Sequence, residues 1–125
     1  MARSTENASN VTSVGTAVGT PAYMAPEQAI GRSSRVDRRS DLYSLGAVLY
    51  ALVTGQPPFH AQTPMDTLKS VVNDQPVPPS QKAPASRGPL EDLILKCMQK
   101  ERNDRPQTAK QIVDELERML PQLPA

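Results

Sequence analysis

The sequence predicts a mainly α-helical fold. Four segments carry apolar residues at helical spacing, most of the 13 prolines lie outside these segments, and no stretch has the strict alternation of a β-strand. The chain of 125 residues suits one domain or part of one. With one Phe, three Tyr and no Trp, its core must be largely aliphatic.

The chain opens with about 20 residues rich in Ser, Thr, Asn, Gly and Ala, which show neither helical nor strand periodicity. This composition predicts a loop or a disordered arm.

Residues 40–54, SDLYSLGAVLYALVT, give the strongest helix prediction. Ser40 or Asp41 suits the helix N-terminus, and Gly55 is placed as the residue just past the C-cap, followed by two prolines. Apolar residues cover nearly the whole surface of this helix, which predicts that it is buried. The residues assigned to one apolar face are Leu42, Leu45, Leu49, Leu52 and Val53.

Three further helices are predicted over residues 63–73, 89–99 and 107–120. In the first, Thr63 is the expected N-cap and Pro64 takes the first helical position, where its missing N–H costs nothing. The proline-rich residues 74–89 predict a long extended connection. The predicted inward stripes are Met65, Leu68, Val71 and Val72, then Leu90, Leu93, Ile94, Cys97 and Met98, and finally Ile112, Val113, Leu116, Met119 and Leu120.

The composition argues against several classes of function. Fourteen Lys and Arg nearly balance thirteen Asp and Glu, so the charge of +1 gives no support to nucleic-acid or membrane-surface binding. The single Cys97 excludes an internal disulfide, and it lies on an apolar stripe, as a core thiol would. His60 has no second metal-ligand type grouped with it, so no metal site is expected. The start of the chain has no apolar leader, and the longest apolar run is too short for a bilayer.

Three separated motifs resemble protein kinases, in the order and spacing of that family. GTPAYMAPEQ at 19–28 resembles the end of the activation segment, with its Ala-Pro-Glu signature. SDLYSLGAVLYALVTGQPPF at 40–59 is similar to the helix that follows, and RNDRPQTAKQI at 102–112 to the Arg-Pro element before the last helix. The resemblance implies a partial, incomplete kinase domain over 1–120, with an activation segment at 1–28, a helical C-terminal subdomain at 29–120 and a tail at 121–125.

Thr20, Gln28, Tyr43 and the TGQPPF ending resemble bacterial serine/threonine kinases of the eukaryotic type. The resemblance implies a parent protein that uses ATP and Mg²⁺ to phosphorylate Ser and Thr of protein substrates. It also implies a cytoplasmic location, or the cytoplasmic part of a membrane-anchored parent.

The sequence contains no Gly-rich loop, strand lysine, His-Arg-Asp or Asp-Phe-Gly motif. In kinases these parts hold ATP and Mg²⁺ and supply the catalytic base. We therefore expect a fragment that begins just after the Asp-Phe-Gly position, binds no cofactor or metal, contains no catalytic residue and is inactive alone. The alternative is a non-enzymatic binding or regulatory module that docks on a kinase or its substrate.

The resemblance implies a buried, structural ion pair between Glu27 and Arg105, since an Arg fork can grip a carboxylate with two hydrogen bonds. It gives Asp41 a structural role in holding the catalytic loop, while the helix dipole alone would also favour an acid there.

A substrate pocket would be formed, by resemblance, by Gly19, Thr20, Pro21, Ala22 and Tyr23. Thr20 would bond the catalytic aspartate, but the alternative is a turn residue before Pro21.

The phosphorylation sites that the resemblance suggests are Thr12, Ser13 and Thr16, although the same residues would suit a polar linker. The basic cluster of Arg32, Arg35, Arg38 and Arg39 is interpreted as a solvated loop, with a phosphate receptor as the alternative.

The helix at 40–54 would be covered in a whole kinase partly by segments that these residues do not include. Leaving roughly 400 Å² of apolar surface uncovered forfeits about 10 kcal/mol, close to the whole stability of a typical domain. We therefore expect a marginal, aggregation-prone or molten helical chain.

Overall fold

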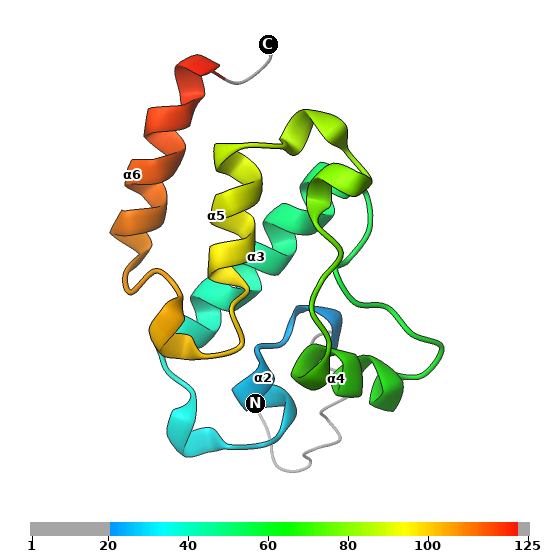
Figure 1. The fold of residues 1–125 in the computed structure, drawn as a ribbon. Helices are drawn as coiled ribbons and strands as arrows, with labels where there is room; N and C mark the ends of the chain where they lie inside the picture. The colour runs from blue at the N-terminus through cyan, green and yellow to red at the C-terminus, as the bar shows by residue number, and fades with distance from the viewer. Residues whose placement is uncertain (1–20, 123–125) are drawn as a thin grey trace.

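The computed structural model describes residues 21–122, and all regular structure within this range is helical. The α-helices are α2 (Pro26–Ala29), α3 (Arg38–Thr54), α4 (Pro64–Asn73), α5 (Pro89–Cys97) and α6 (Ala109–Met119) (Figure 1). Short 3₁₀ turns are η2 (Pro21–Tyr23), η3 (Ser33–Arg35), η4 (Pro79–Gln81), η5 (Pro84–Ser86), η6 (Arg102–Asp104) and η7 (Leu120–Gln122). The predicted mainly α fold is confirmed.

Helix α3 is the longest helix, and the other elements are arranged around it (Figure 1). It packs most extensively against α5, and α6 in turn packs against α5. On the other side of the molecule, α4 packs against α2 and η2. The short segment that ends in α2 therefore lies between the central helix and α4, which fixes its position from two directions.

The first turn of α3 begins earlier than the sequence predicts. Asp37, not Ser40 or Asp41, is the N-cap, because its carboxylate accepts a hydrogen bond from the Arg39 N–H at 2.8 Å. The Asp37 N–H donates in return to Ser40 Oγ at 3.2 Å. At the other end Gly55 adopts φ of 82°, the left-handed conformation expected of a residue just past the helix.

The other helix boundaries lie close to the predicted ones. Thr63 caps α4 by accepting from the Asp66 N–H at 3.1 Å, with Pro64 at the first position, as predicted. Helix α5 ends two residues before the predicted end, and α6 starts after an N-cap at Thr108. The connection over 74–89 is not simply extended, because η4 and η5 interrupt it.

Two clusters of buried apolar residues form the core. Tyr43, Ala47, Tyr50, Phe59, Val71, Ile94, Met98 and Ala25 make the first, and Leu42, Leu93, Cys97, Ile112 and Met119 the second. Gly46 lets α3 approach α5 closely, since a Cβ built at Gly46 would lie 2.5 Å from Cys97 Cβ.

The predicted apolar face of α3 is partly wrong. Leu45 is 39% exposed and Leu52 is 75% exposed, and Val48 next to them is also exposed. The buried side of α3 is instead the one that carries Tyr43, Ala47 and Tyr50. The other residues predicted to point inward but exposed are Met65, Val113 and Leu120. The helical spacing of apolar residues identifies an apolar surface, but it does not show which part of that surface packs against another element.

Candidate functional site

The most elaborate polar arrangement in the described residues centres on Glu27 and Arg105. Pro26 occupies the first position of α2, and the Gln28 side chain accepts from the Ala25 N–H at 2.9 Å, which closes the start of this short helix. Glu27 follows Pro26 and points inward, with 6% of its surface exposed. Arg105, which follows η6, is 2% exposed.

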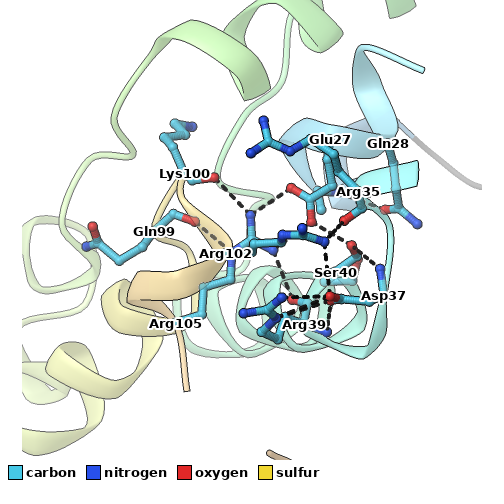
Figure 2. Close-up of polar contacts among 12 residues, drawn as sticks. Glu27, Gln28, Arg35, Asp37, Arg39, Ser40, Gln99, Lys100, Arg102 and Arg105 are labelled. Atoms are coloured by element: carbon cyan, nitrogen blue, oxygen red, sulfur yellow. Dashed lines mark hydrogen bonds and ion pairs between the residues drawn. The ribbon is translucent and has the colours of Figure 1, made fainter. Parts of the chain in front are cut away.

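The structure brings these two residues into direct contact across 78 positions of sequence. Arg105 Nη1 and Nη2 each donate to one oxygen of Glu27 at 2.8 Å, which is the two-pronged geometry of a guanidinium on a carboxylate. Figure 2 shows the pair at the meeting point of α2, the start of α3 and the segment after α5.

Every donor of the Arg105 guanidinium has a partner. Besides Glu27, Arg105 donates to three backbone carbonyls: Arg39 O at 3.0 Å, Gln99 O at 2.8 Å and Lys100 O at 3.0 Å. A buried arginine without such partners would be strongly destabilising. Full satisfaction makes Arg105 a cross-link between α3 and the chain around η6.

Glu27 receives a third hydrogen bond, from Ser40 Oγ at 2.5 Å. Burial alone would raise the pKa of this carboxyl, but the hydrogen bonds from Arg105 and Ser40 together outweigh it. The pKa of Glu27 is therefore lowered, and the residue carries its charge at neutral pH. An ionised, immobile carboxylate with three donors is a structural anchor and not an acid or base.

Tyr43 lies against the same pair. Its ring centroid is 5.1 Å from Arg105 Cζ, a cation–π contact, and its hydroxyl is buried without a hydrogen-bond partner in the described residues. Burial raises the pKa of this phenol, so it stays neutral.

A second polar network, which the sequence analysis missed, surrounds the first. Asp37 Oδ2 accepts from Arg39 Nη2 at 2.8 Å and from Arg102 Nη1 at 3.1 Å. The hydrogen bonds from Arg39, helped by both positive charges, lower the Asp37 pKa to about 2. Asp37 lies three residues before Ser40, which is the spacing of a capping box. This spacing was the signal in the sequence that could have identified Asp37 as the N-cap.

The same network corrects the interpretation of the basic cluster. Arg39 also donates to Asn103 and Gln107, at 2.7 and 2.9 Å, and Arg38 Nε donates to the Gln107 carbonyl at 3.1 Å. These two arginines tie α3 to the segment before α6, although Arg38 is exposed, while Arg32 and Arg35 are exposed and lie before α3. Only half of the cluster is a solvated loop.

Part of the predicted substrate pocket lies next to this anchor. Pro21, Ala22 and Tyr23 form η2, with Ala22 buried, and the Tyr23 carbonyl accepts from Ser44 Oγ at 2.6 Å. Asp41 is exposed on the first turn of α3. Gly19 and Thr20, together with Thr12, Ser13 and Thr16, lie outside the described residues.

Other reactive groups are few in residues 21–122. Cys97 is buried, and burial raises its pKa to about 11, so it is an inert core thiol. The same part of the chain contains no cluster of three or more His, Cys, Asp or Glu side chains that could hold a metal ion. Of the helices described, none combines the length and apolar character that a membrane crossing needs.

Comparison with known proteins gives a consistent result. Residues 1–116 match the family model "Protein kinase domain". The chain is 40% identical over 119 residues to serine/threonine-protein kinase PknB of Mycobacterium leprae, which covers 95% of this chain and 19% of that protein. It is 44% identical over 101 residues to serine/threonine-protein kinase PksC of Streptomyces coelicolor, which covers 81% of this chain and 18% of that protein. The chain thus spans about a fifth of the length of these relatives.

A solved structure has a similar fold. The twitchin kinase region from C. elegans matches with a TM-score of 0.68 and 26% identity, over 75% of this chain and 16% of that one. The similarity extends to most of the residues described above.

Proposed function

The chain belongs to the protein kinase family, and from this premise we propose that it forms the substrate-side part of a serine/threonine kinase domain. In the intact protein this domain would transfer the γ-phosphate of ATP to Ser or Thr of protein substrates. Residues 1–28 would serve as the activation segment and residues 29–120 as the helical subdomain that supports it. We expect this domain to act in the cytoplasm, either free or as the cytoplasmic part of a membrane-anchored protein.

The observation that carries this proposal is the position of the Glu27–Arg105 pair. Glu27 lies in α2, the helix that follows η2. Its two hydrogen bonds of 2.8 Å with Arg105 join α2 to a residue 78 positions away. A protein substrate must be held with its hydroxyl aligned to the transferring phosphoryl group, and phosphoryl transfer depends almost entirely on such positioning. A pocket wall at Pro21–Tyr23 needs a fixed support, and the buried pair supplies it.

The 125 residues do not supply the rest of the reaction. Nucleotide binding and Mg²⁺ coordination need the Gly-rich loop, the strand lysine and the Asp-Phe-Gly aspartate, and proton removal from the hydroxyl needs the His-Arg-Asp aspartate. We therefore propose that this chain alone is catalytically inactive and that ATP and Mg²⁺ bind only to the intact domain.

A chimeric kinase tests the substrate-side role. The corresponding segment of PknB would be replaced by residues 1–120, and transfer of ³²P from ATP to a protein substrate would be measured. We expect an active chimera whose activity falls at least tenfold on Arg105→Ala and is unchanged on Arg118→Ala, an exposed control. A folded chimera without activity would contradict the proposal.

A second candidate function, a binding module without catalysis, is favoured by one observation. Met65 at the start of α4 is 61% exposed. A protein that docked on this end of α4 would remove the Met65 side chain from water, which favours binding. If the isolated chain binds a purified kinase and Met65→Glu abolishes binding while Lys69→Glu does not, the module is favoured.

A further inference from the structure

A small pocket lies between α2, α4 and the segment that follows α5. Its volume is about 180 Å³. Ile30 and Val72 give it apolar walls, while Arg35, Lys100 and Arg102 bring positive charge. Two carboxylates also line it. Glu27 is paired with Arg105 and Arg102 with Asp37, which leaves Arg35 and Lys100 against Glu101. The pocket is therefore suited to a small anion with an apolar part.

Lys100 is an unusual lysine at this pocket. Its Nζ donates to the Val71 carbonyl at 2.6 Å, in the last turn of α4, and lies 4.5 Å from the centroid of the Phe59 ring. These contacts hold the amine at one place, so it does not sweep through solvent as a surface lysine does. Because Val71 is fully buried, the amine sits at the edge of the core.

The surroundings of this amine favour its neutral form. The Lys100 pKa is lowered to about 8, mainly by burial; the Asp74 charge opposes this shift and the Arg105 charge adds to it. At pH 7 about one Lys100 side chain in ten is then neutral, against fewer than about one in a thousand for a lysine of ordinary pKa. Only the neutral amine has a lone pair and can act as a nucleophile.

The two arginines complete the arrangement. Arg102 uses Nη1 for the Arg35 carbonyl and Asp37, at 2.6 and 3.1 Å, which fixes the guanidinium beside the pocket. Arg35 is exposed and lines the pocket together with Lys100 and Arg102. A planar guanidinium matches a phosphate group in geometry as well as charge.

We propose that this pocket binds acyl phosphates and that Lys100 is a site of acylation by them. The phosphate would lie on Arg35 and Arg102, with its acyl carbon near Lys100 Nζ. The neutral amine attacks the carbonyl carbon, a C–N bond forms, and the C–O bond to phosphate breaks. Phosphate leaves with the bonding electron pair, and the nitrogen loses one proton to water. The amide keeps one N–H, which can still donate to Val71 O.

Site-resolved acetylation kinetics test the proposal. The purified chain would be incubated with acetyl phosphate at pH 7, and the rate at each lysine measured by peptide mass spectrometry. Lys82 is the matched internal control, because it also lies over an aromatic ring, 5.3 Å from the Tyr50 centroid, but is exposed and outside the pocket. We expect Lys100 to react at least about tenfold faster than Lys82, and the two rates to become equal in urea.

Two variants and a second reagent separate the anion pocket from simple amine reactivity. Arg35→Gln should slow acetylation of Lys100 by acetyl phosphate several-fold, whereas Arg32→Gln, in the same loop but outside the pocket, should not. N-acetylimidazole, which carries no phosphate, should show no dependence on Arg35. Equal rates at Lys100 and Lys82 in the helical, native chain would overturn the proposal, as would a Lys100 rate that Arg35→Gln leaves unchanged.

Discussion

The N-terminal end of α3 and one of its apolar faces differ in how completely other described residues cover them. At its N-terminal end, Ser40 and the Arg39 carbonyl join a buried network in which Glu27 and all five donors of Arg105 have partners. Along another face, Leu45, Val48 and Leu52 are exposed in a row at helical spacing. Both features lie on one helix, but only the polar network is completed by the described residues.

This difference shows how two kinds of interaction depend on context. A buried ion pair must be satisfied in place, because an unpartnered charge in the interior costs several kcal/mol. An apolar face can remain in water at about 25 cal/mol per Å² until a partner covers it. The anchor can thus position α2 within this chain, while the apolar row depends on whatever else packs against α3.

Breaking the anchor should have the largest effect. Arg105→Ala leaves the Glu27 carboxylate buried without its main partner, which should lower the free energy of unfolding by about 3–5 kcal/mol. Urea denaturation followed by circular dichroism would measure this loss. Arg118→Ala is the matched control, since its ion pair with Glu115 is exposed and should cost less than about 0.5 kcal/mol. Equal urea midpoints for the two variants would show that the Glu27–Arg105 pair does not stabilise the fold.

The sequence predicted the helices better than it predicted the surroundings of each side chain. Helical spacing, Thr63 and Gly55 identified α3 and α4 within two residues, because caps and periodicity are local signals. The pairing of Glu27 with Arg105 came from a family resemblance, since nothing local links residues 78 positions apart.

The sequence could not predict which face of α3 points into the core. Leu42 and Leu45 look alike in the pattern, yet only Leu42 is buried, because tertiary packing decides which stripe of an all-apolar helix is covered. The Asp37 network was missed for a related reason. Its partners Arg39 and Arg102 are ordinary charges until the fold brings η6 beside the start of α3.

A substitution at Gly46 tests the close packing on the covered side of α3. In an exposed helix Gly→Ala stabilises by up to about 1 kcal/mol. Here Gly46→Ala would place a Cβ 2.5 Å from Cys97 Cβ, so α3 and α5 must separate, and we expect a loss of about 1–3 kcal/mol. Urea denaturation gives the sign of the change. A stabilised Gly46→Ala variant would show that α5 does not pack on α3 as described.

Asp37→Asn should have a smaller effect that depends on pH. Asn still caps a helix, so the change removes mainly the ion pairs with Arg39 and Arg102, worth about 1 kcal/mol in such a partly exposed network. Because the Asp37 pKa falls from 3.8 to about 2 on folding, its contribution is present above pH 3.8 and is lost as the pH falls through about 2. The difference in melting temperature between wild type and Asp37→Asn should therefore shrink between pH 4 and pH 2. A constant difference would show that the charge is not the cause.

Polar substitution of the exposed row should change stability least and association most. Leu52 is 75% exposed and Val48 is 42% exposed, so Val48→Gln and Leu52→Gln remove apolar surface that is largely or partly in water already. The free energy of unfolding of the double variant should fall by no more than about 1 kcal/mol. The same surface can drive self-association, so the double variant should elute as a smaller species than wild type in size-exclusion chromatography with light scattering. The matched control is Tyr50→Gln, on the buried side of the same helix, which should unfold the chain. A loss of several kcal/mol in the double variant would mean that this face is packed within the chain, and the contrast between the two sides of α3 would then fail.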